Sequence, residues 1–273
     1  MCLDQQIGCN IEAYIDDVVI KSKTTDNLIA DLEETFANLK RYRWKLNPSK
    51  YIFGVPSSIL LGYIVSAHGI EPNPDKVSAI TNMKRPTCVK DIQKLTWYMA
   101  DLSRLISHLG EKGLPFFKLL KASERFSWSE EADTAFEQLK LFLMKPPIMM
   151  ALQPNETPLI YIAATSRVIS TTIVVEREEA RHAYKVQRPV YFISKVLNEP
   201  KTRYPQVQKL LYAILITSCK LRHYFEYYKI IVVTEFSLGD ILCNKEANGH
   251  IIKWVVELGT YSIEFRSRPT IKS

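Results

Sequence analysis

The order of apolar and polar positions in the first 70 residues predicts short strands around one amphipathic helix. Residues 11–20 read IEAYIDDVVI, two arms rich in β-forming residues on either side of a polar pair, which predicts a strand–turn–strand unit. A helix is predicted to open at Thr25-Asp26, because apolar residues then recur at helical spacing, at Leu28, Leu32, Phe36 and Leu39. Residues 51–65 combine β-forming residues with Gly54, Pro56 and Gly62, which predicts hairpins.

A helical pattern follows over residues 75–110, and Pro86 divides it into two helices. Ser127 and Glu130 stand three positions apart before the next apolar run, the spacing of a capping box, and predict a helix through Met144. Four prolines then interrupt regular structure, at 146, 147, 154 and 158. We place a domain boundary in this proline-rich stretch.

After residue 158 the pattern changes to that of a mixed α/β unit. Four runs of β-forming residues predict strands at 159–163, 171–176, 189–193 and 230–234. Residues 206–224 predict one helix, whose apolar face comprises Val207, Leu210, Leu211, Ile214, Leu215 and Cys219. Strands and helices mixed in this order indicate an α/β or α+β domain.

Composition narrows the class of protein. Of 273 residues, 47% are hydrophobic and 24% charged, which is average for a globular chain and argues against wholesale disorder. No apolar run approaches the ~18–20 residues that span a membrane, and the first ten residues do not resemble a secretory signal. The five cysteines are scattered without a CxxC pair, so we expect reduced thiols in an intracellular protein.

Charge points to a polyanionic partner or to a solvated basic surface, and charge alone favours neither. The net charge is +7, and the basic residues are unevenly distributed. Residues 76–121 hold nine Lys or Arg and three acids, and residues 40–50 hold five basic residues and no acid. Basic segments of this kind are typical of proteins that contact nucleic acid.

The most informative short motif is Tyr14-Ile15-Asp16-Asp17. Two adjacent carboxylates at a strand turn repel one another unless water or a cation neutralises them, and hard oxygen ligands suit Mg²⁺. Phosphoryl-transfer enzymes use such carboxylates to hold two metal ions. From these residues alone, an ordinary polar hairpin turn is the simpler interpretation.

The motif resembles the YxDD box of reverse transcriptases, and the resemblance extends over about residues 5–270. Five later segments resemble gypsy-type retrotransposon polyproteins, the plant elements above all: residues 31–50, LGYIVS at 61–66, NPDK at 73–76, FSW at 126–128 and AFEQLK at 135–140. The resemblance implies residues 1–74 as the end of the palm with its primer-grip hairpin and residues 75–150 as a helical thumb. It implies residues 151–273 as an RNase H-like mixed-sheet domain, which makes the fold class α+β or α/β.

The resemblance also implies roles for individual residues. Asp16 and Asp17 would be the catalytic, Mg²⁺-binding carboxylates, and Tyr14 would lie near the incoming nucleotide or the primer end. The tripeptide Leu61-Gly62-Tyr63 would hold the primer terminus, and basic residues between 76 and 121, Lys90 and Lys94 among them, would follow the template–primer backbone without reading sequence. The implied partners are an RNA–DNA or DNA duplex and the rest of the polyprotein or another subunit, in a cytoplasmic particle or the nucleus.

The chain departs from the family at the carboxylates that catalysis requires. The third metal-binding Asp of the polymerase has no counterpart upstream of Asp16, and the fingers are absent. In residues 151–273 the family has acids on the first strand, where Ala163 and Ala164 stand, and at the start of the central helix, where residues 206–210 hold none and Leu210 stands instead. Glu235 alone fills its expected position. We therefore expect a fragment of a polymerase that is inactive by itself both as a polymerase and as a nuclease, or alternatively a non-catalytic binding or connection module. We expect the four tryptophans to be packing residues rather than base-stacking platforms.

Overall fold

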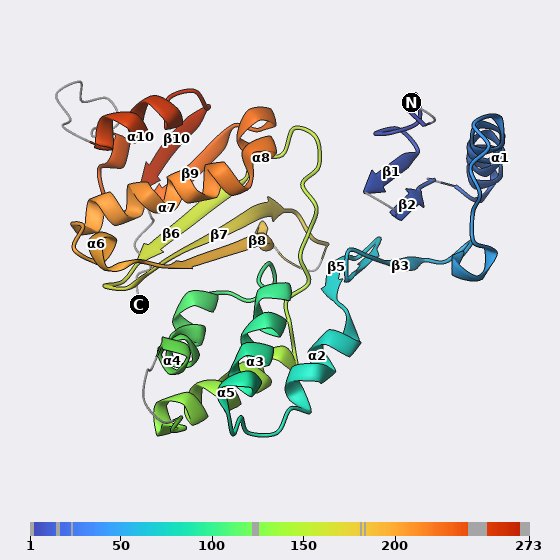
Figure 1. Cartoon of the computed structure of the whole chain (residues 1–273). Coiled ribbons are helices and arrows are strands. Elements are labelled where there is room, and N and C mark those ends of the chain that lie inside the picture. Colours follow the sequence, from blue (N-terminus) through green and yellow to red (C-terminus); the bar gives the residue numbers. More distant parts are fainter. Residues whose placement is uncertain are drawn as a thin grey trace. The chain divides into compact units, whose positions relative to one another are not determined.

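The computed structural model describes residues 3–14, 17–22, 24–121, 126–180, 182, 184–239 and 250–267 (Figure 1). By its internal contacts the chain divides into two units, Met1–Ala67 and His68–Ser273. We describe each unit by itself.

Unit 1 contains the predicted strand–turn–strand unit and the predicted helix. Its elements are β1 Ile11–Tyr14, β2 Asp17–Ile20, α1 Thr25–Arg41, the 3-10 turn Pro48–Lys50, β3 Ser57–Leu60 and β4 Tyr63–Ser66. β1 pairs antiparallel with β2, and β3 pairs antiparallel with β4. The hydroxyl of Thr24 caps α1 by accepting a hydrogen bond from the Asn27 amide at 3.3 Å.

The buried core that the structure describes in unit 1 is small. It consists of Leu3, Ile11 and Leu39, with Ile20 packed against them. Buried hydrogen bonds supplement it, because Gln6 donates to the Thr35 hydroxyl at 3.1 Å and accepts from Asn38 at 2.9 Å. Since little apolar surface is buried here, we expect unit 1 to be less stable than unit 2.

The first part of unit 2 is helical. Its elements are β5 Gly69–Pro72, α2 Pro74–Thr81, α3 Val89–Asp101, α4 Leu109–Lys121 and α5 Glu130–Leu143. The pattern over 75–110 does predict two helices, but α3 already ends at Asp101, and α4 was not expected. The predicted N-cap of α5, Ser127, lies two residues too early. The N-cap is Ser129, whose hydroxyl accepts the hydrogen bond from the Ala132 amide.

The second part of unit 2 is a five-stranded mixed sheet in the order β10-β9-β6-β7-β8 (Figure 1). Its strands are β6 Leu159–Ala164, β7 Val168–Arg177, β8 Val186–Val196, β9 Ile230–Thr234 and β10 Ile263–Ser267. β9 runs parallel to β6 and β10, whereas β7 runs antiparallel to β6 and β8. The remaining helices are α6 Glu199–Thr202, α7 Gln206–Lys220, α8 Arg222–Tyr227 and α10 His250–Leu258.

Helices pack on both faces of this sheet. On one face α7 covers the main core, and its Thr217 hydroxyl donates to the Thr171 hydroxyl on β7 at 3.0 Å. On the other face the amide of Gly110 at the start of α4 meets Ser194 of β8. The single helix predicted over 206–224 is in fact two, since the backbone of Leu221 leaves the helical region between α7 and α8.

Candidate nucleic-acid interface and the expected metal sites

The predicted polymerase motif lies at the β1–β2 turn. Tyr14 ends β1 and Asp17 begins β2, and the two are register partners. Both are exposed, Tyr14 with 55% of its surface, so the ring is available for contact. Asp16 and Ile15 lie outside the described residues. The roles of Tyr14, Asp16 and Asp17 therefore stay predictions.

The predicted primer-contacting tripeptide forms a two-residue hairpin loop. β3 ends at Leu60, β4 begins at Tyr63, and Leu61 and Gly62 between them have φ values of 51° and 77°. Positive φ at both loop positions is the geometry of a type I′ turn, which glycine and asparagine tolerate and leucine adopts at a cost of about 1–2 kcal/mol. Leu61 therefore lies in the loop that joins β3 to β4, with 48% of its surface exposed.

The basic residues Lys90 and Lys94 lie on an exposed face of α3. Because 90, 94 and 97 follow helical spacing, this face also carries Trp97. Trp97 is 64% exposed, and its ring stands edge-on to Tyr98 with centroids 5.1 Å apart. The Lys94 ammonium lies 5.9 Å from the centroid of the same Tyr98 ring. The expectation that the tryptophans are core or partly buried packing residues is therefore wrong for Trp97, and also for Trp44, which is 55% exposed.

The start of α3 is fixed by Asp91. Its carboxylate accepts hydrogen bonds from the Thr87 amide at 2.9 Å, the Thr87 hydroxyl at 3.0 Å and the Cys88 amide at 3.3 Å. The bonds from Thr87 hold the pKa of this carboxyl below its usual value. An ionised Asp91 thus anchors the helix on which Lys90 and Lys94 are displayed.

In the RNase H-like sheet, the parallel strands β6 and β9 end at the same edge. Tyr161 pairs with Val233, so Ala163 and Glu235 lie two residues further along their strands. The N-terminus of α7 reaches the same edge, because the Gln206 side chain donates to the Ala164 carbonyl at 2.8 Å. The resemblance to reverse transcriptases implies carboxylates at this edge. Of Ala163, Gln206 and Glu235, only Glu235 is acidic.

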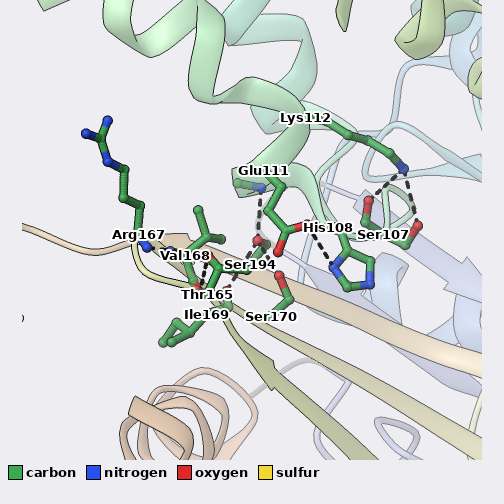
Figure 2. A network of polar contacts seen from close by, with 11 residues as sticks. Ser107, His108, Glu111, Lys112, Thr165, Arg167, Val168, Ile169, Ser170 and Ser194 are labelled. Atoms are coloured by element: carbon green, nitrogen blue, oxygen red, sulfur yellow. Dashed lines mark hydrogen bonds and ion pairs between the residues drawn. The ribbon is translucent and has the colours of Figure 1, made fainter. Parts of the chain in front are cut away.

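A lysine lies behind this edge. Lys209 is 6% exposed, and its ammonium donates to the Ser166 carbonyl at 3.2 Å. Arg167, which follows Ser166 in the chain, is exposed, and Figure 2 shows its side chain extending away from the other labelled residues. The edge therefore carries cationic groups where metal-binding acids would be needed.

The described residues bring no group of metal-binding side chains together at either predicted place, and Asp16 of the β1–β2 turn lies outside them. Nowhere in the described ranges do three or more His, Cys, Asp or Glu side chains gather closely enough to hold a metal ion. At the β1–β2 turn the described part contributes Asp17, and at the β6–β9 edge it contributes Glu235. Two-metal phosphoryl transfer needs several carboxylates around the ions, so no catalytic step follows from these positions.

A polar network joins α4 to the sheet (Figure 2). The Gly110 amide donates to the Ser194 hydroxyl at 2.9 Å, and that hydroxyl lies 2.9 Å from the Ser170 hydroxyl. A Cβ on Gly110 would stand 2.7 Å from both the Ser194 Oγ and a methyl group of Val168. Only glycine therefore allows α4 to approach so closely, and sequence analysis did not find this contact.

None of the helices in the described part combines the length and hydropathy needed to cross a bilayer.

Comparison with families shows that residues 128–232 match the "RNase H-like domain found in reverse transcriptase". Among curated proteins, the chain is 26% identical to the Pol polyprotein of transposon 297 of Drosophila melanogaster, covering 92% of this chain and 23% of that protein. It is 22% identical to the transposon Tf2-3 polyprotein of Schizosaccharomyces pombe, covering 95% and 20%. The chain thus spans between a fifth and a quarter of these relatives.

Solved structures confirm the fold class. The foamy viral protease–reverse transcriptase in complex with an RNA/DNA hybrid matches all of this chain and 37% of its own, with a TM-score of 0.82 and 17% identity. The same viral protein with double-stranded DNA gives a TM-score of 0.80, again at 17% identity. The chain is thus similar in sequence to part of retrotransposon Pol polyproteins, residues 128–232 match the RNase H-like domain of reverse transcriptases, and the fold is that of the foamy viral protein.

Proposed function

We propose that this chain is a gypsy-type reverse transcriptase region that binds template–primer duplex through its phosphates and, by itself, catalyses neither polymerisation nor RNA cleavage. In this proposal residues 1–74 are the end of the palm, residues 75–150 the thumb and residues 151–273 a degenerate RNase H-like domain. The protein would act inside the cell.

The observation that carries the binding proposal is the exposed face of α3. Lys90 and Lys94 project from one side of a helix together with Trp97, which is 64% exposed. An exposed aromatic ring one turn beyond two lysines offers an apolar surface for sugars or bases beside charge for phosphates. Relatives of the same fold were solved with an RNA/DNA hybrid and with double-stranded DNA, which supports a duplex as the partner.

The absence of catalysis rests on the carboxylates of the described residues. Among the described residues, Glu235 has no cluster of metal-binding partners around it, and Gln206 and Lys209 stand at the start of α7 where the family has an acid. Metal-assisted hydrolysis needs two ions held in place, and one carboxylate beside a buried ammonium does not hold two divalent cations.

The test is a binding comparison by fluorescence anisotropy with a labelled 20-base-pair RNA/DNA hybrid. The double variant K90E/K94E should bind more weakly than wild type, and its plot of log affinity against log salt should be flatter by about 1.8, since each lost phosphate contact removes about 0.9.

The matched control is K220E/K253E, which changes the charge equally at two exposed lysines on α7 and α10. If both double variants bind alike, net charge and not the α3 face carries the affinity. If the folded wild-type chain does not bind the hybrid at 50 mM salt, the proposal fails, and the alternative function as a structural connection module is favoured.

A further inference from the structure

A second basic surface surrounds the edge where β6, β9 and α7 meet. Arg167 lies in the β6–β7 turn and Arg203 lies three residues before α7; both are exposed. The Gln206 bond to Ala164 and the Lys209 bond to Ser166 tie this turn to the start of α7. The two arginines therefore flank one contact between a turn and a helix N-terminus.

The charge at this edge is positive. Lys195 and Lys201 both lie over the ring of Tyr212 in α7, at 5.7 and 5.0 Å from its centroid. Arg167, Arg203 and the buried Lys209 add three basic residues in the β6–β7 turn and around the start of α7, whereas Glu199 in α6 and Glu235 directly after β9 are acidic.

The helix itself adds to this field. α7 has 15 residues, no capping side chain and no acidic residue in its first turn, so the partial positive charge of its N-terminus is not neutralised locally. The carboxyl ends of parallel strands beside a helix N-terminus are a frequent place for phosphate groups to bind. Lys209 is held nine-tenths buried behind this place with one carbonyl acceptor described for its ammonium. A carbonyl oxygen accepts this bond without neutralising the ammonium charge.

We propose that this edge is an anion site that holds the sugar–phosphate backbone of the duplex without any divalent metal. Side-chain cations supply the positive charge that metal ions supply in a two-metal nuclease, and the phosphate is held but not cleaved. The inference rests on the proposed function and deepens it, because it adds a second contact surface to the α3 face.

The experiment measures hybrid affinity for full-length wild type, R167E/R203E, R167K/R203K and K220E/K253E, at constant ionic strength, in Mg²⁺ and in EDTA. We expect wild type to bind at least as well in EDTA as in Mg²⁺. R167E/R203E should bind about tenfold more weakly at 50 mM salt, and its slope of log affinity against log salt should be smaller in magnitude by about 1.8. The affinity of R167K/R203K should stay within about threefold of wild type.

The control pair separates local from global charge. Lys220 stands at the opposite end of α7 from Gln206, about 21 Å away along the helix, so K220E/K253E should change affinity little. If R167E/R203E and the control behave alike while K90E/K94E weakens binding, this inference is overturned and the proposed function stands. A requirement for Mg²⁺ of tenfold or more in wild-type affinity would also overturn it. Loss of all binding in folded wild type would overturn both.

Discussion

Replacement of Gly110 by alanine should destabilise unit 2, although the same change inside a helix normally stabilises. A new Cβ would lie 2.7 Å from the Ser194 Oγ and 2.7 Å from a Val168 methyl group, both on packed strands. Overpacking of this kind costs about 1–3 kcal/mol, and the strained Gly110–Ser194 hydrogen bond about 1 kcal/mol more. The gain in helix propensity offsets about 1 kcal/mol. The net loss is about 1–3 kcal/mol, or a Tm lower by about 2–12 °C.

Gly113 in the same helix is the matched control. Its added Cβ would meet the end of the Phe117 ring at 2.8 Å and the terminal methyl of Met99 at 3.3 Å. The Phe117 side chain is partly exposed and can move, so G113A should stay within about 0.5 kcal/mol of wild type or exceed it. The contrast between the two alanines isolates the contact with the sheet.

The assay is urea unfolding followed by tryptophan fluorescence in a W44F background. Trp44 is the tryptophan of unit 1, and Trp97, Trp128 and Trp254 then report on unit 2. In an S194A background, which removes one of the two clashing atoms, G110A should cost about 1 kcal/mol less than in wild type. If G110A is as stable as G113A, α4 does not approach the sheet as the structure has it.

Three further outcomes are expected. The full chain should not cleave the RNA strand of a hybrid in Mg²⁺ or Mn²⁺, and E235Q should change nothing; metal-dependent cleavage that E235Q abolishes would contradict the account. The chain should give no primer extension with poly(rA)/oligo(dT) and dTTP. A product that disappears in D16N would show that this chain alone is enough for polymerisation. E156Q should lower stability at pH 7 by about 1.5–3 kcal/mol, because Glu156 accepts from Arg177 at 2.7 and 2.9 Å. Since these bonds lower the folded-state pKa of Glu156 from 4.5, their contribution is complete above that pH and disappears as pH falls through the folded value. Urea titrations of E156Q and wild type should therefore converge in acid.

Much of the fold follows from periodicity, and the failures have physical causes. α1, α5, α7 and the strands β6 to β9 carry clear periods, so their existence was predictable, whereas the edge strand β10 was not predicted. α4 was not expected because Gly110, Gly113 and Pro115 act as helix breakers in isolation. Gly110 is explained by the close approach of α4 to the sheet, which no local pattern encodes. Likewise the apolar period through residue 224 continues across Leu221, although the backbone turns there.

The candidate surfaces were only partly predictable. Lys90 and Lys94 follow from the charge distribution, but the exposure of Trp97 does not, because an aromatic residue in an amphipathic helix is usually buried. The loss of acids at Ala163, Ala164 and residues 206–210 is visible in the sequence. That Lys209 is buried beside the same edge, with Arg167 and Arg203 around it, depends on the contact between the β6–β7 turn and α7.

The most direct test of phosphate-mediated duplex binding is the salt dependence of wild-type affinity for two hybrids of unrelated sequence between 50 and 200 mM salt. If Lys90, Lys94, Arg167 and Arg203 each contact one phosphate, the slope of log affinity against log salt should be about −3.6, a loss of about 150-fold over this range. The two hybrids should differ by no more than about twofold. A folded chain that fails to bind at 50 mM salt, or binds one sequence tightly with little dependence on salt, would contradict the account.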